Sequence, residues 1–180
     1  SKAFVRYINS IVVGNGLDPD VDMGPTANSR RISSLSGLVE DANNNGAIVA
    51  TGGNKIDIKG YFFQPTVLLN VPKNSRIMSE EPFGPIAVIN AVKSLDDAIE
   101  KANSVPYGLA GYAFTNRADY IDQLIDRVEV GNLSINTLEA SMPETPFGGI
   151  KSSGHGREGG LEGLQNYMSI KNVWHSSKIS

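Results

Sequence analysis

Cysteine is absent from this chain of 180 residues, which also contains only two histidines and one tryptophan. Without cysteine there is no disulfide bond and no thiolate zinc site, and the commonest strong nucleophile of covalent catalysis is missing. The two histidines, His155 and His175, lie far apart and lack the spacing of metal ligands. We therefore expect no metal site formed by the side chains of this chain.

The chain also lacks an excess of basic charge and any long apolar run. Its 16 Lys and Arg residues stand against 19 Asp and Glu residues, which gives a formal net charge of −3. Nucleic acid is not expected as a partner, because phosphate backbones require a basic face. No run approaches the ~20 apolar residues of a membrane span, and residues 1–13 lack a signal-peptide pattern. The expected location is the cytoplasm, without a membrane partner.

What the sequence does contain is enough apolar residues, 40%, for a core, and a regular alternation of patterns from residue 86 onward. Strands are predicted over residues 86–92, 109–114 and 133–136, and helices over residues 94–104 and 117–128. Ser94 is placed to cap the first of these helices and Gly131 to end the second. The strand over 86–92 is apolar on both faces, as in a parallel sheet covered by helices. With right-handed crossovers the predicted fold class is α/β, a three-layer doubly wound parallel sheet.

Further elements are predicted on either side of this region. Helical spacing predicts helices over residues 3–12, 28–44 and 158–167, and β-rich runs at 48–51 and 66–71 predict paired strands with a turn at 57–60. Residues 169–175 alternate like a half-exposed strand with no evident partner. This strand pairs either with an edge of another subunit or with the chain's own sheet, and the sequence alone does not decide between them.

The segment EEPFGP at residues 80–85 is the first candidate for chemistry. Pro82 holds Glu81 out of the α region, and Pro85 fixes the exit just before a predicted core strand. A carboxylate on such a rigid loop can accept hydrogen bonds from ribose hydroxyls, and a neighbouring aromatic ring can stack on a planar group. The alternative is that the two adjacent glutamates simply face solvent.

The segment GHGREG at residues 154–159 has the GxGxxG spacing of a dinucleotide fingerprint. That fingerprint requires a strand directly before the first glycine and an acidic residue about twenty positions later. Here a long connection, residues 137–156, precedes it, and no acidic residue follows Val173. A glycine-rich helix entry is therefore the favoured interpretation. His155 beside Ser152 and Ser153 is too local for a catalytic triad.

Six short motifs follow one another along the chain. They are MGP at 23–25, EEPFGPI at 80–86, ANSVPYGLA at 102–110, FT at 114–115, GNLSIN at 131–136 and PFGGIKSSGHGRE at 146–158. In order and spacing they closely resemble the NAD(P)-dependent aldehyde dehydrogenase superfamily. The resemblance implies that residues 1–168 form the C-terminal portion of that family's catalytic domain, and that residues 169–180 form its oligomerisation strand and tail.

The resemblance also implies roles for individual residues. Glu81 would bind the hydroxyls of the nicotinamide ribose, Phe83 would contact the nicotinamide end of NAD or NADP, and Phe147 would line the substrate tunnel. Residues 138–145 would form part of the tunnel mouth. Asn136 and residues 151–157 would stabilise the loop and the subunit contacts, and in some members backbone carbonyls at positions like Lys151 and Gly154 hold a monovalent cation. Pro82 replaces the Ile or Leu of other members.

The reaction implied is the oxidation of an aldehyde to a carboxylate through a cysteine thiohemiacetal and thioester. The family's cysteine nucleophile, general-base glutamate and oxyanion-stabilising asparagine have no counterpart here, and we expect them upstream of Ser1. No catalytic residue is therefore assigned, and the isolated chain is expected to be inactive. The segment MPETPFGG at 142–149 looks most like semialdehyde dehydrogenases of the succinate-semialdehyde type. A homo-oligomer through the terminal strand is expected.

Two alternatives belong to other classes of protein. The chain is a non-catalytic folded fragment or self-associating module, or it is an independent nucleotide-binding α/β domain. The second alternative leaves the terminal strand and the matched motifs unexplained.

Overall fold

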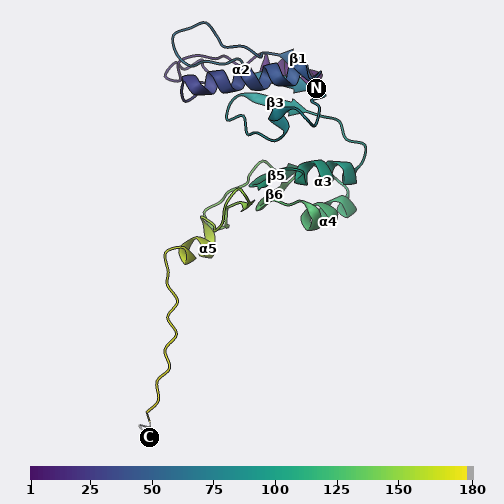
Figure 1. The fold of residues 1–180 in the computed structure, drawn as a ribbon. Coiled ribbons are helices and arrows are strands. Elements are labelled where there is room, and N and C mark those ends of the chain that lie inside the picture. The colour runs from purple at the N-terminus through teal and green to yellow at the C-terminus, as the bar shows by residue number, and fades with distance from the viewer. Residues whose placement is uncertain (178–180) are drawn as a thin grey trace. The chain divides into compact units, whose positions relative to one another are not determined.

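The structure, a computed structural model, describes residues 1–177, which form two compact units (Figure 1). The first unit is Ser1–Ala91, and the second begins at Val92. Within residues 1–177, no helix is long and apolar enough to cross a membrane.

The first unit contains two α-helices, a short 3-10 helix and one small sheet. These elements are α1 (Lys2–Ile8), α2 (Ser29–Asn44), β1 (Ile48–Thr51), β2 (Thr66–Leu69), η1 (Arg76–Met78) and β3 (Ile86–Ile89). The strand order is β1-β2-β3. The predicted pairing of the first two strands is confirmed, because β1 and β2 are antiparallel, and β3 joins the other edge of β2 in parallel.

Helix α2 supplies one wall of the core of this unit, and Figure 1 shows it lying along the sheet. Its apolar face is buried, as the spacing of these residues predicts. The buried residues of α2 are Leu35, Leu38, Val39 and Ala42, and they pack with Phe63, Leu68, Val71 and Ile77. The side chain of Asn28 accepts a hydrogen bond from the Arg31 amide and so fixes where the helix begins.

The second unit contains three helices and two pairs of strands. These elements are α3 (Leu95–Asn103), β4 (Tyr107–Gly108), β5 (Ala110–Ala113), α4 (Ala118–Arg127), β6 (Asn132–Ile135), β7 (Ile150–Lys151) and α5 (Gly160–Gln165). Strands β5 and β6 are parallel and joined through α4, and β4 pairs with β7 in antiparallel fashion. The predicted cap of α3 is confirmed, because the Asp97 amide donates to Ser94 Oγ at 3.1 Å.

The mixture of helices and strands is confirmed, but the predicted three-layer doubly wound parallel sheet is not. The described strands form three small sheets, β1-β2-β3, β4-β7 and β5-β6. An alternating pattern identifies the strands without identifying their neighbours. Strand β3 pairs with β2, which precedes it, whereas β5 pairs with β6 after a helical crossover. The strand–helix series is thus divided between separate sheets.

Gly131 has a different role from the predicted one. Helix α4 already ends at Arg127, where Val128 turns to an extended conformation. A Cβ atom on Gly131 would overlap the carbonyl oxygen of Gly148. The glycine is therefore required by the close approach of two backbone segments rather than by the end of the helix.

The segment expected to form a terminal strand is extended and exposed. Residues 168–176 belong to no helix or strand, so the predicted strand at 169–175 pairs with no described strand of this chain (Figure 1). Of the tail predicted over 169–180, residues 178–180 lie outside the described residues.

Candidate functional site

The loop between η1 and β3 carries both residues that were predicted to contact a cofactor, Glu81 and Phe83. Pro82 and Pro85 restrict the backbone on either side of Phe83. Phe83 itself has a left-handed backbone, with φ 45, and the residue is 66% exposed. A non-glycine residue in this conformation costs of the order of 1–3 kcal/mol, and such strain clusters at binding sites. The loop thus presents an aromatic ring outward from a constrained backbone.

The adjacent glutamates of this loop differ in their partners. Arg76 donates from Nε to Glu80 Oε1 at 2.7 Å and from Nη2 to Glu80 Oε2 at 2.9 Å. This hydrogen bond lowers the pKa of the Glu80 carboxyl below its ordinary value. Among the described residues, none donates a hydrogen bond to the exposed carboxylate of Glu81. Glu80 is committed to a structural pair, whereas Glu81 is available to a ligand.

Arg31 contacts this loop from the first turn of α2. Its guanidinium carbon lies 5.5 Å from the centroid of the Phe83 ring, within the range of a cation–π interaction. The contact holds the ring from one side. Sequence reasoning missed Arg31, because it lies about fifty residues from the loop and belongs to none of the motifs.

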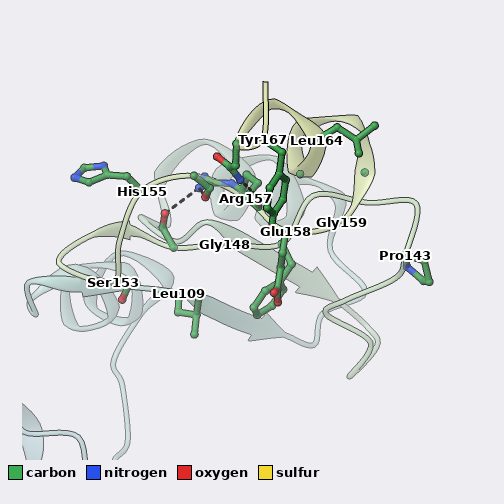
Figure 2. A pocket seen from close by; sticks show the side chains of 16 residues that line it. Leu109, Pro143, Gly148, Ser153, His155, Arg157, Glu158, Gly159, Leu164 and Tyr167 are labelled. Atoms are coloured by element: carbon green, nitrogen blue, oxygen red, sulfur yellow. Dashed lines mark hydrogen bonds between the residues drawn. The ribbon is translucent and has the colours of Figure 1, made fainter. Parts of the chain in front are cut away.

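Phe147, the residue predicted to line the substrate tunnel, lies in the second unit beside a cavity. Its backbone pairs with that of Glu158, by N–H···O bonds of 2.7 and 2.8 Å. The cavity has a volume of about 610 Å³ (Figure 2). Its lining includes apolar side chains and glycines between positions 148 and 163, and also the polar or charged side chains of His155, Arg157 and Glu158. The half-buried Phe147 therefore faces a space large enough for a small molecule.

The glycine-rich run that borders this cavity is a helix entry, as favoured from the sequence. Gly154, Gly156 and Gly159 all have positive φ, at 120, 82 and 70. Arg157 follows Gly156, and its Nη1 donates to the Gly149 and Gly156 carbonyls at 2.9 and 2.7 Å. The run follows a turn after β7, not a strand that leads directly into the first glycine. The context of a dinucleotide fingerprint is therefore lacking in this segment.

His155 and its serine neighbours are not arranged for nucleophilic chemistry. The Ser153 hydroxyl oxygen accepts a hydrogen bond from the Gly108 amide at 3.0 Å, and the imidazole of His155 is exposed. In residues 1–177, no group of three or more His, Cys, Asp or Glu side chains is placed to hold a metal ion.

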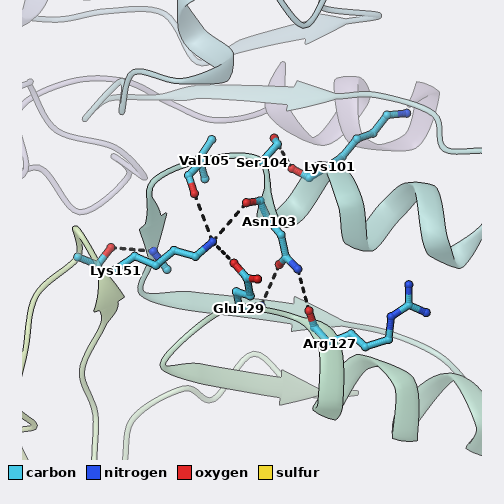
Figure 3. Close-up of polar contacts among 9 residues, drawn as sticks. Lys101, Asn103, Ser104, Val105, Arg127, Glu129 and Lys151 are labelled. Atoms are coloured by element: carbon cyan, nitrogen blue, oxygen red, sulfur yellow. Dashed lines mark hydrogen bonds and ion pairs between the residues drawn. The ribbon is translucent and has the colours of Figure 1, made fainter.

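A polar cluster around Lys151 joins β7 to the ends of α3 and α4 (Figure 3). Lys151 Nζ forms an ion pair with Glu129 and lies 3.3 and 3.4 Å from the carbonyl oxygens of Asn103 and Val105. The Asn103 side chain accepts from the Glu129 amide at 2.9 Å and donates to the Arg127 carbonyl at 2.7 Å. The sequence singled out Lys151 within residues 151–157 but gave no role to Asn103, although a motif contains it.

The family model described as aldehyde dehydrogenase family matches residues 1–173. The chain belongs to the aldehyde dehydrogenase family.

Relatives of this aldehyde dehydrogenase chain show how much of a family member it represents. A 4-(hydroxymethyl)benzenesulfonate dehydrogenase of Comamonas testosteroni is 43% identical over 163 residues, 88% of this chain and 33% of the relative. A succinate-semialdehyde dehydrogenase [NADP(+)] of Mycobacterium leprae is 38% identical over 173 residues, 96% of this chain and 38% of the relative. The chain thus spans about a third of the length of these relatives.

A solved aldehyde dehydrogenase confirms the relationship in three dimensions. The betaine aldehyde dehydrogenase of Staphylococcus aureus, determined in complex with NAD+, superposes with a TM-score of 0.88 at 32% identity. The match covers 99% of this chain and 38% of that enzyme. Family relatives therefore use NAD+ or NADP+, and the resemblance based on the six motifs is confirmed.

Proposed function

We propose that these 180 residues are the part of an NAD(P)+-dependent aldehyde dehydrogenase that supplies the nicotinamide-ribose contact, one wall of the substrate tunnel and the subunit interface. The observation that carries the proposal is the contrast between Glu80 and Glu81. Arg76 holds the first of these carboxylates in place, and the second is left without a partner in residues 1–177. Glu81 lies two residues from a ring that the same loop exposes.

The residues present fit the nicotinamide half of the cofactor. Both oxygens of the Glu81 carboxylate are available to accept hydrogen bonds from ribose hydroxyls, and the exposed ring of Phe83 offers a surface for a planar group. Bound NAD(P)+ supplies the hydride acceptor. The residues of the chain bind and orient: Glu81 sets the position of the ribose, and Arg31 holds the Phe83 ring from one side.

Phe147 and its cavity support a role in binding the substrate. The cavity combines apolar side chains with backbone groups of the glycine-rich segment and with the polar side chains of Ser153, His155, Arg157, Glu158 and Asn166. This mixed lining suits a small molecule with one polar end. The names of both curated relatives specify compounds with an anionic group, a carboxylate in one and a sulfonate in the other. We therefore propose, as the substrate class, an aldehyde that also carries an anionic group, such as a semialdehyde.

The extended tail supports the proposed subunit interface. Its apolar side chains are unusually exposed, with Ile170 fully exposed and Trp174 92% exposed. An extended segment such as residues 169–175 can add to the sheet edge of a second copy. Light scattering of the chain at high concentration is expected to detect association that I170S/W174S abolishes, and a monomeric wild-type chain would contradict this role.

Nuclear magnetic resonance with nicotinamide mononucleotide tests the cofactor contact on this chain directly. Millimolar ligand is expected to shift the backbone amide signals of residues 79–85. Glu81→Gln should weaken these shifts, whereas the matched variant Glu80→Gln should leave them, because Glu80 already pairs with Arg76. Equal effects of the two variants, or no shifts in this loop, would refute the assignment of Glu81.

Activity assays test whether the isolated chain lacks dehydrogenase activity. The chain contains no cysteine, so it is expected to form no NADH or NADPH from aldehydes on its own. Measurable production of either would refute this. Calorimetry with NAD+ should detect weak binding at most, since one ribose contact is present. Micromolar affinity would instead support an independent nucleotide-binding domain.

A further inference from the structure

Two Asn-Gly sequences, Asn15-Gly16 and Asn45-Gly46, lie in exposed turns of the first unit. Glycine after asparagine leaves the backbone nitrogen sterically accessible, because it has no Cβ. The asparagine of such a pair deamidates spontaneously when the backbone nitrogen of the glycine can reach the side-chain carbonyl carbon of the asparagine. Exposure does not distinguish the two pairs, so the difference between them lies in their hydrogen bonds.

Asn45-Gly46 is held in place at each group that would have to move. The amide nitrogen of Gly46 donates to the Asn43 carbonyl at 3.0 Å. Asn45 Nδ2 donates to the Asp41 carbonyl at 2.8 Å, and Asn45 Oδ1 accepts from Asn74 Nδ2 at 3.0 Å. Attack would break the first of these bonds and displace the side chain from the other two.

Asn15-Gly16 is restrained far less. The Gly16 amide donates no hydrogen bond to any described residue, and a Cβ atom built on Gly16 would meet nothing within 4 Å. The single side-chain bond of Asn15 is that from the Leu17 amide to Oδ1, at 3.3 Å. This bond draws electron density from the side-chain carbonyl carbon, Cγ, and leaves Nδ2 free to depart.

We propose that Asn15 is a site of spontaneous deamidation and that the fold protects Asn45. The deprotonated Gly16 nitrogen attacks Asn15 Cγ. The new N–C bond forms, the Cγ–Nδ2 bond breaks, and the nitrogen leaves as ammonia after taking a proton from water. Water then opens the resulting succinimide at either carbonyl and gives aspartate or isoaspartate.

The product changes a turn that is already acidic. Each conversion adds one negative charge to a segment that contains Asp18, Asp20 and Asp22. Isoaspartate also inserts a methylene into the backbone at Asn15, whose carbonyl accepts from the Asp18 amide at 2.9 Å. We expect the turn to lose this bond when isoaspartate forms.

Peptide mapping by mass spectrometry tests the proposal on the full 180-residue chain in mildly alkaline buffer. Asn15 is expected to react about tenfold faster than Asn45 while the chain is folded, since the latter must first break its backbone bond. In concentrated urea the two rates should converge. Equal rates in the folded chain, or the same difference in urea, would overturn the proposal.

Gly16→Ala provides the matched variant. Gly16 has open space around it and no positive φ, so alanine fits without strain. Its methyl group should slow the reaction at Asn15 about tenfold and leave the rate at Asn45 unchanged. An unchanged rate at Asn15 in a variant with a wild-type circular dichroism spectrum would rule out attack by the Gly16 nitrogen.

Discussion

Asn136 pairs both polar atoms of its side-chain amide with the backbone of Thr115, accepting from the amide nitrogen and donating to the carbonyl oxygen, each at 2.9 Å. Asn90 makes the same pair of contacts with Val71, at 2.7 and 2.9 Å. In both cases the asparagine directly follows the second strand of a parallel pair, β6 or β3, and its partner lies two residues beyond the first strand. In each case the asparagine side chain adds two hydrogen bonds just beyond the end of the paired strands.

Two substitutions of Asn136 should separate the stability that its side-chain hydrogen bonds contribute from the cost of its left-handed backbone, with φ 58. Asn136→Gly suits that conformation and loses both bonds, at an expected cost of about 1–3 kcal/mol. Asn136→Ala should cost about 1 kcal/mol more, because alanine tolerates a left-handed backbone poorly. Urea unfolding followed by circular dichroism measures both. Equal stability of the two variants would show that backbone strain does not matter here.

The cluster around Lys151 predicts unequal effects for the two ends of its ion pair. Lys151→Met leaves a carboxylate and two carbonyls without their donor, at a site where the lysine side chain is 27% exposed, and should cost about 1–3 kcal/mol. Glu129→Gln removes a charge that is 51% exposed and should cost less than about 1 kcal/mol. Thermal unfolding in low and high salt measures the difference, and a larger loss for Glu129→Gln would contradict the assignment.

Local patterns predicted the helices and most strands of this chain because each depends on residues close in sequence. The buried face of α2 and the Ser94 cap of α3 are cases in which apolar spacing and one hydroxyl suffice. The pairing of β3 with β2 could not be predicted in this way, since it depends on which strand edge is free. The need for glycine at position 131 could not be predicted either, because it arises from the close approach of Gly148, seventeen positions away.

In the candidate site, too, some residues could be predicted from the sequence and others could be found only from the fold. Glu81 and Phe83 could be selected from the motif around Pro82, since one loop holds all three. The contrast between Glu80 and Glu81 could not be predicted from the sequence. It depends on the side chain of Arg76, which lies four residues before Glu80 and forms its ion pair with that glutamate. Arg31 was missed for the same reason: its contact with Phe83 exists in the fold alone.

Gly131→Ala is predicted to be the most damaging single methyl addition in the second unit. The added Cβ would overlap the Gly148 carbonyl oxygen, which also accepts from Asn132 Nδ2 at 2.9 Å. We expect a loss of about 3 kcal/mol or more. Gly111→Ala is the matched control, because its Cβ would meet Leu133 and Val130 at 3.5 Å, an ordinary contact. Similar stability of the two variants, measured by urea unfolding, would contradict the close approach.

The pair between Glu80 and Arg76 predicts a pH dependence of stability. Its hydrogen bond lowers the pKa of Glu80 from the ordinary 4.5, so the folded state binds that proton less readily than the unfolded state does. The stabilising contribution is therefore fully present above about pH 4.5 and is lost as the pH falls through the lower pKa of the folded chain. Glu80→Gln should show a shallower loss of stability in acid than the wild type. The same slope in acid for Glu80→Gln and the wild type would show that the ion pair with Arg76 contributes nothing.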